Sequence, residues 1–171
     1  MTIQEDILEA REKRCEIQKV LLNKFNLPII SFTLNIPGGI KNNALLEKVH
    51  KEGIKAIVGE AEKNNIEIKE IIIRDSAAGN EALFSCAAEA HILKNLMLEI
   101  EDNHELGRLF DIDVLEGEGH ILGRSSIGRL PRKCFVCNNS AKLCARNRTH
   151  SLEELNNAIY NKMTIFFDKQ S

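Results

Sequence analysis

Two aspartates at alternating positions, Asp111 and Asp113, are the residues of this sequence best suited to chemistry. They lie in the mostly apolar run 106–115. Alternate side chains of a β-strand share a face, so the two carboxylates point to one side and Phe110 and Ile112 to the other. Neighbouring like charges repel and cost solvation, which favours a cation between them, and a divalent metal that also holds phosphate oxygens is the candidate. The alternative is an exposed acidic pair that binds nothing.

A basic segment follows this strand. Between Glu118 and Glu153 there is no acidic residue, and the remainder of the chain carries a balance of −9. A cationic segment next to a carboxylate pair indicates a polyanion site, with metal on one side and guanidinium groups on the other. A solvated basic surface is the alternative. The basic residues are Arg124, Arg129, Arg132, Lys133, Lys142, Arg146 and Arg148.

Three cysteines and a histidine in the same segment have the spacing of a metal site. Cys134 and Cys137 form a CxxC pair, Cys144 follows seven residues later, and His150 lies six beyond that. Three thiolates and an imidazole would complete a tetrahedral Zn²⁺ site, and the alternative is a reduced, metal-free knuckle. The other two cysteines, Cys15 and Cys86, have no such neighbours and are predicted to be buried.

The composition is that of a soluble globular domain of 171 residues, with 43% hydrophobic and 28% charged residues. No apolar run approaches the length of a membrane span, and the N-terminus lacks a signal pattern. We therefore expect a cytoplasmic protein with reduced cysteines and no membrane partner. One tyrosine and no tryptophan argue against base stacking, and so against a nucleic-acid partner.

Hydrophobic periodicity predicts the elements that position these residues. Helices are expected at 3–24, 43–64, 88–102 and, after a capping box at Ser151, 151–166. Strands are expected at 29–36, 66–75, 82–86 and 109–115, with a hairpin return at 120–124. Gly38 and Gly39 after the first strand either cradle a phosphate or form a plain turn.

This order of elements predicts an α+β fold, a split βαβ (ferredoxin- or palm-like) antiparallel sheet with helices on one face. In that topology the first and fourth strands are neighbours, so Thr33 and Asn35 would lie beside Asp111 and Asp113 on an uncovered face. The face resembles the metal platform of nucleotidyl-transferring palm domains. We expect one domain, 1–171, with a core at about 28–124, a Cys-rich tail at about 125–150 and the final helix at about 151–167, preceded by an N-terminal helix.

Three strings of sequence in order then resemble a known family. They are the stretch 31–38 (Ser-Phe-Thr-Leu-Asn-Ile-Pro-Gly), the stretch 106–115 around the two aspartates, and the tail from Pro131 through the cysteines to Leu155. Together they closely resemble the citrate lyase holo-acyl-carrier-protein synthases, also called apo-citrate lyase phosphoribosyl-dephospho-CoA transferases. The resemblance extends from Ala10 to the last helix.

The resemblance implies a nucleotidyltransferase. Such enzymes join the phosphoribosyl-dephospho-CoA part of 2′-(5″-triphosphoribosyl)-3′-dephospho-CoA to a serine of the citrate lyase acyl carrier subunit and release diphosphate. Attack on the α-phosphorus calls for a metal and arginines to offset the growing charge.

We assign Asp111 and Asp113 to Mg²⁺, with one of them a candidate acceptor of the serine proton, and Asn35 to orienting the nucleotide or a metal-bound water. His104 is a further candidate for the general base. Candidates for the triphosphate are Arg108, Arg124 and Arg132, and then Arg11, Arg14, Lys41 and Arg146.

The residues alone leave two other interpretations of the function open. In one, the chain is a zinc-ribbon interaction module whose basic tail binds an acidic partner without turnover. In the other, it is a phosphate-binding subunit of a larger lyase complex. Both predict that the isolated chain transfers nothing, whereas the enzyme reading predicts that Asp111→Ala abolishes transfer.

Overall fold

The fold is built around a five-stranded antiparallel sheet. The computed structural model describes residues 2–171. The strands are β1 (Ile29–Leu34), β2 (Ile68–Ser76), β3 (Gly79–Cys86), β4 (Phe110–Glu116) and the short β5 (His120–Ile121), in the order β2-β3-β1-β4-β5. The first and fourth strands are neighbours, as predicted, and the fold class is confirmed.

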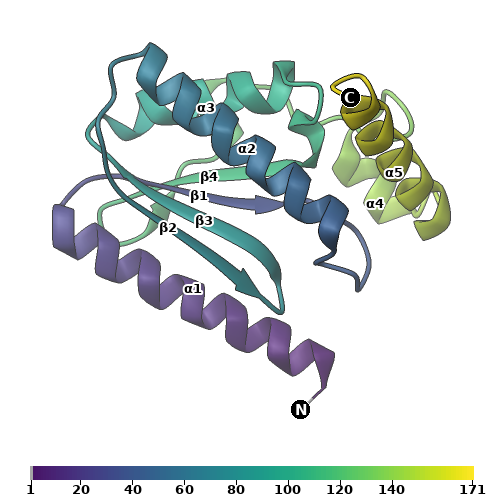
Figure 1. The fold of residues 1–171 in the computed structure, drawn as a ribbon, viewed down its shortest axis with the longest axis horizontal. Helices are drawn as coiled ribbons and strands as arrows, with labels where there is room; N and C mark the ends of the chain where they lie inside the picture. Colours follow the sequence, from purple (N-terminus) through teal and green to yellow (C-terminus); the bar gives the residue numbers. More distant parts are fainter. Residues whose placement is uncertain (1) are drawn as a thin grey trace.

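Two long helices cover one face of the sheet (Figure 1). They are α2 (Ala44–Lys63) and α3 (Ala90–Asn103). The main core lies beneath them and includes Phe32 of β1 and Phe110 and Ile112 of β4. Gly53 of α2 permits the close approach, because a Cβ there would lie 2.2 Å from Cζ of Phe32. The predicted alternation therefore holds, with the apolar side chains of β1 and β4 facing the helices.

The first helix, α1 (Ile3–Phe25), lies across the opposite face (Figure 1). A capping box between Thr2 and Glu5 starts it, and Asn26 in the left-handed conformation ends it. Leu21 and Leu22 of α1 pack on Ile29 and on other apolar residues of the sheet. The face that the sequence suggested would be uncovered is therefore partly covered, because its apolar end needs a partner.

The chain after β5 is irregular apart from a single turn of 3-10 helix at Arg124–Ile127, and it ends in two helices, α4 (Ala141–Asn147) and α5 (Leu152–Asp168). Another 3-10 turn, Gly107–Leu109, directly precedes β4. The capping box at Ser151 and Glu154 is present, as predicted. α4 was not expected from periodicity, since seven residues give too few turns to show a pattern. Of the two isolated cysteines, Cys86 is buried, but Cys15 is exposed, so that prediction was wrong for Cys15. Within residues 2–171, no helix is both long and apolar enough to cross a membrane.

Candidate active site

Five of the predicted site residues meet in one cavity between α1, the end of β1 and β4. This polar pocket has a volume of about 340 Å³. Arg11 and Arg14 enter it from α1, Asn35 and Lys41 from the segment after β1, and Asp111 from β4. Residues more than 90 positions apart in sequence thus surround one space, and they combine cationic groups with a carboxylate.

The two aspartates share a face of β4, as their spacing predicted. Asp111 lies opposite Thr33 of β1, and Asp113 lies opposite Ser31. Burial, and then the charge of Asp111, raise the pKa of Asp113 above its ordinary value. No hydrogen bond to the Asp113 carboxylate is found within residues 2–171. A half-buried acid with no partner beside a second acid has the chemistry of a divalent-cation ligand.

The cations of the polar pocket differ in how far they are already paired. Arg14 donates to the buried Glu81 of β3 at 3.0 Å. Lys41 donates to the backbone oxygen of Ile36, and burial followed by the charge of Arg11 lowers the pKa of Lys41. Arg11 is exposed and has no acidic partner in the described part of the chain. Arg11 and Lys41 are therefore the groups with charge to spare for an anion.

Gly79, the first residue of β3, leaves room for the backbone of Lys41. Gly79 has φ of +110°, and a Cβ at this position would lie 2.9 Å from the backbone oxygen of Lys41. Only glycine combines this backbone conformation with such a close approach. Glycine at this position therefore allows the segment that carries Lys41 to pass close to the start of β3.

Arg124 and Arg132 gather on the open edge of β4 around Glu101 of α3. β5 pairs only with Leu115 and Glu116, so the edge of β4 before Leu115 has no strand beside it. There Glu101 accepts from the Ile112 N–H at 2.9 Å, from Arg124 at 2.7 Å, and from Arg132. The side chain of Glu101 is 1% exposed, so three donors surround one buried carboxylate.

Arg132 links this edge to the polar pocket. Besides Glu101, its guanidinium contacts Asp111 at 3.2 Å. On the same edge Lys94 of α3 donates to the backbone oxygen of Ile112 at 2.9 Å. Lys94 and Glu101 together replace the missing strand by satisfying both backbone groups of Ile112. The edge is thus closed by charged side chains, one of which reaches the carboxylate pair.

The predicted cysteine and histidine ligands also come together. One ligand atom from each of Cys134, Cys137, Cys144 and His150 lies within 4.8 Å of the others. The Sγ atoms of Cys137 and Cys144 are 3.4 Å apart, and Nε2 of His150 is 3.3 Å from Sγ of Cys137. Four such ligands on a closed cluster match a structural zinc site rather than a catalytic one.

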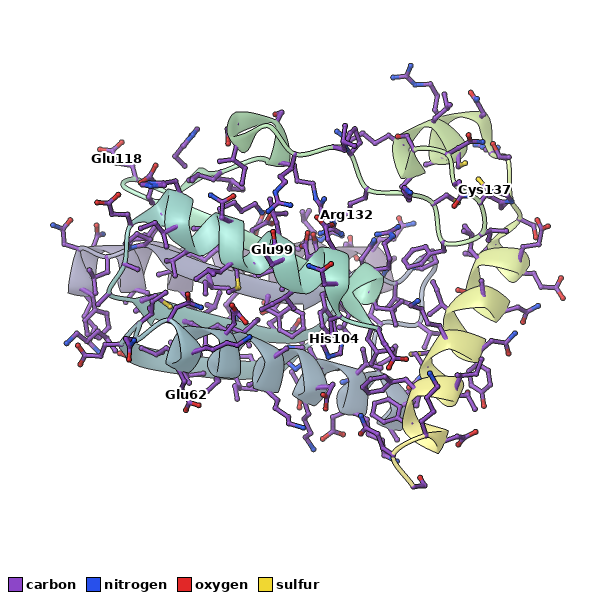
Figure 2. All side chains as sticks on the ribbon, turned by 90° about the horizontal axis from the view of Figure 1, so that it is seen from above. Glu62, Glu99, His104, Glu118, Arg132 and Cys137 are labelled. Atoms are coloured by element: carbon purple, nitrogen blue, oxygen red, sulfur yellow. The ribbon has the colours of Figure 1, made fainter. Side chains whose placement is uncertain are left out.

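Three other predicted residues lie apart from the polar pocket. His104 packs on Phe110 and Phe166, and its Nδ1 accepts from the Leu106 N–H at 3.0 Å. Figure 2 shows His104 and Arg132 on different sides of α3. Arg146 is exposed on α4, and Arg108 lies beneath the ring of Phe135.

Sequence analysis did not identify three charged residues around the site: Glu101, Lys94 and Glu81. The seven-residue separation of Lys94 and Glu101 places both on the buried stripe of α3, together with Leu98. Charged residues inside an apolar stripe were a signal for buried pairing. For Glu81 no such signal existed, because every residue of β3 is buried and its partner Arg14 comes from a distant helix.

The fold and the polar pocket define an α+β protein with a split βαβ core, carrying an acidic pair and free cations suited to a phosphorylated ligand. Comparison with known sequences identifies the family. The chain belongs to the apo-citrate lyase phosphoribosyl-dephospho-CoA transferase family, whose model matches residues 2–166.

Individual relatives agree with this assignment. A protein of Shigella boydii serotype 18 with that name is 40% identical over 152 residues, which cover 89% of this chain and 83% of the relative. Proteins of the same name from Escherichia coli strain SE11 and Escherichia coli O157:H7 give the same values. The family resemblance expected from the three sequence strings is confirmed.

Proposed function

We propose that this protein transfers phosphoribosyl-dephospho-CoA from 2′-(5″-triphosphoribosyl)-3′-dephospho-CoA to a serine of the acyl carrier subunit of apo-citrate lyase, and releases diphosphate. Family membership supports the reaction class. The observation that carries the proposal is the polar pocket, where the carboxylate of Asp111 faces Arg11 and Lys41.

In the transfer, the serine Oγ forms a bond to the α-phosphorus while the bond from that phosphorus to the bridging oxygen of the diphosphate breaks. The serine proton goes to a carboxylate, and the electron pair of the broken bond stays on the diphosphate. Asp113 is our candidate proton acceptor, because its carboxylate has no hydrogen-bond partner within residues 2–171 and burial raises its pKa. Arg11 and Lys41 would stabilise the charge that grows on the leaving group.

Asp111 and Asp113 would hold Mg²⁺, which when bound supplies Lewis-acid stabilisation of the phosphate oxygens. The fit is supported by the partnerless Asp113 carboxylate and by the few protein ligands that Mg²⁺ needs at phosphate sites. Arg132 holds Asp111 in position from the side at 3.2 Å. Arg124 shares Glu101 with Arg132, so we assign it to supporting Arg132.

The reaction is tested by the intact mass of the carrier subunit after incubation with this protein, Mg²⁺ and the triphosphoribosyl donor. We expect a mass gain equal to the phosphoribosyl-dephospho-CoA group. Asp111→Ala should slow transfer by about 100-fold or more while carrier binding is retained, and Glu118→Ala, exposed on the β4–β5 turn, is the control. No mass gain would favour a binding module without turnover, and full activity of Asp111→Ala would remove the catalytic assignment.

We also propose that the Cys/His cluster binds structural Zn²⁺. Tetrahedral ligands about 2.3 Å from zinc are separated by ~3.8 Å, close to the sulfur and nitrogen distances in the cluster. Between positions 123 and 150 the only buried side chain is Cys144, so this segment has no hydrophobic core of its own and a metal would stabilise it.

Elemental analysis tests the zinc site. We expect one equivalent of zinc per chain, which Cys137→Ser removes and Cys15→Ser keeps, because Cys15 is exposed on α1 and outside the cluster. Protein isolated without chelators that neither contains zinc nor takes it up would contradict the assignment.

A further inference from the structure

A second cavity, the apolar pocket, lies between the segment after β1, α4, α5 and the Cys/His cluster. Its volume is about 520 Å³, inside the ~300–1,000 Å³ range of small-molecule sites. Most of its wall is carbon, contributed by Pro37, Phe135, Ala141, Ala145, Leu152 and Leu155. A wall of this kind accepts a flat, poorly hydrated group better than a triphosphate.

Two arginines interrupt this apolar wall, Arg108 and Arg148. The guanidinium of Arg108 lies 4.5 Å from the ring centroid of Phe135. All three of its nitrogens are shielded from solvent, and none has a hydrogen-bond partner within residues 2–171. Burial, and then the charges of Arg132 and Arg124, lower the pKa of Arg108. A shielded cation with unused donors is costly unless an anionic acceptor arrives. Arg108 lines two cavities, and only the apolar pocket has no acidic residue in its lining, since the other already contains Glu101 and Asp102.

The apolar pocket adjoins the polar pocket through a shared residue. Asn35 lines both cavities, and no other residue does. A ligand that occupied both cavities would therefore pass beside Asn35. Three of the four cluster residues, Cys134, Cys144 and His150, also line the apolar pocket, so the Cys-rich tail forms part of its wall.

We propose that the apolar pocket binds the adenosine 5′-diphosphate unit of the donor, an inference that rests on the proposed function. In the donor, the triphosphoribosyl group is joined to adenosine, and adenosine is joined through a diphosphate to pantetheine. With the triphosphate in the polar pocket, adenosine is the next group along the molecule. The adenine packs against Phe135 and Leu155, and the diphosphate supplies the acceptors that Arg108 lacks.

The test is calorimetric binding of ADP to the whole protein, without carrier and without turnover. Ala145→Trp fills the pocket from an exposed position of α4, and Leu143→Trp is the matched control, because Leu143 is 49% exposed on the same helix and lines neither pocket. Because the indole would occupy the space of the ligand, Ala145→Trp should weaken ADP binding by about tenfold or more, which corresponds to at least about 1.4 kcal/mol. Leu143→Trp should leave it unchanged.

Two further arms separate the sources of binding. Lys41→Ala alters only the polar pocket, so it should leave ADP affinity unchanged, and Arg148→Asn, which suits the left-handed backbone at this position, should lower it. ADP binding that Lys41→Ala weakens and Ala145→Trp does not would overturn the proposal, as would binding of 4′-phosphopantetheine in place of ADP.

These outcomes are separate from those of the transfer assay. If wild-type protein modifies the carrier but ADP affinity is insensitive to Ala145→Trp, the pocket assignment is wrong and the proposed function stands. If ADP binds as expected but the carrier gains no mass, the proposed function is wrong, and the apolar pocket is then a nucleotide site of another reaction.

Discussion

Glu101 offers the sharpest test of how charged side chains close the β4 edge. Its carboxylate is 1% exposed and accepts from the Ile112 N–H and from two arginines, Arg124 and Arg132. Those arginines have side chains only 17% and 21% exposed. Replacing Glu101 with alanine would leave the Ile112 N–H without its acceptor and remove one acidic partner from each arginine.

The expected loss follows from these contacts. An orphaned backbone N–H costs about 1–3 kcal/mol, and breaking a buried ion pair costs about 3–5 kcal/mol. Since Arg124 keeps Asp102 at 2.9 Å and Arg132 keeps Asp111, we expect the lower end of the two costs together, about 4 kcal/mol for Glu101→Ala. Glu101→Gln keeps an acceptor for the Ile112 N–H and should lose roughly half of that.

Equilibrium unfolding in urea, with the metal content unchanged, measures these values. Glu99→Ala is the matched control, because Glu99 lies two residues earlier on α3 with a side chain 46% exposed and pairs with Arg129 at the surface. Exposed pairs contribute about 1 kcal/mol or less. Equal losses for Glu101→Ala and Glu99→Ala would refute the view that Glu101 is the buried centre of this edge.

Three further outcomes are expected. The folded-state pKa of Asp113 lies above the ordinary 3.8, so metal-free protein should lose stability as the pH rises from the ordinary to the folded-state pKa of this residue. Asp113→Asn should remove this loss in pH-dependent urea unfolding. An unchanged profile would contradict the burial argument. Gly53→Ala should destabilise by about 1–3 kcal/mol in thermal unfolding, because its Cβ would meet Phe32 at 2.2 Å, whereas the control Gly59→Ala meets nothing within 4 Å and should be neutral or stabilising. Removing metal with a chelator should raise amide hydrogen exchange in residues 128–150 but not in β1 and β3; uniform exchange across both regions would argue against a local structural metal.

The local features of the chain were readable from sequence because they depend on neighbouring residues. Alternation placed Asp111 and Asp113 on one face of a strand, and the capping box at Ser151 marked the start of α5. The order of helices and strands then limited the topology enough to pair β1 with β4. The spacing of Cys134 and Cys137 likewise predicted a cluster that the fold assembles with Cys144 and His150.

Other features were decided only by the tertiary structure. Periodicity showed that α1 has an apolar stripe, but the surface it covers depends on which end of the sheet needs burial, and that choice brought Arg11 and Arg14 to Asp111. The role of Glu101 also depends on distant elements. Because β5 pairs only with Leu115 and Glu116, Glu101 lies against the part of the β4 edge that β5 does not reach. A sequence pattern specifies which side chains leave water, whereas the packing of distant elements decides which charges they meet.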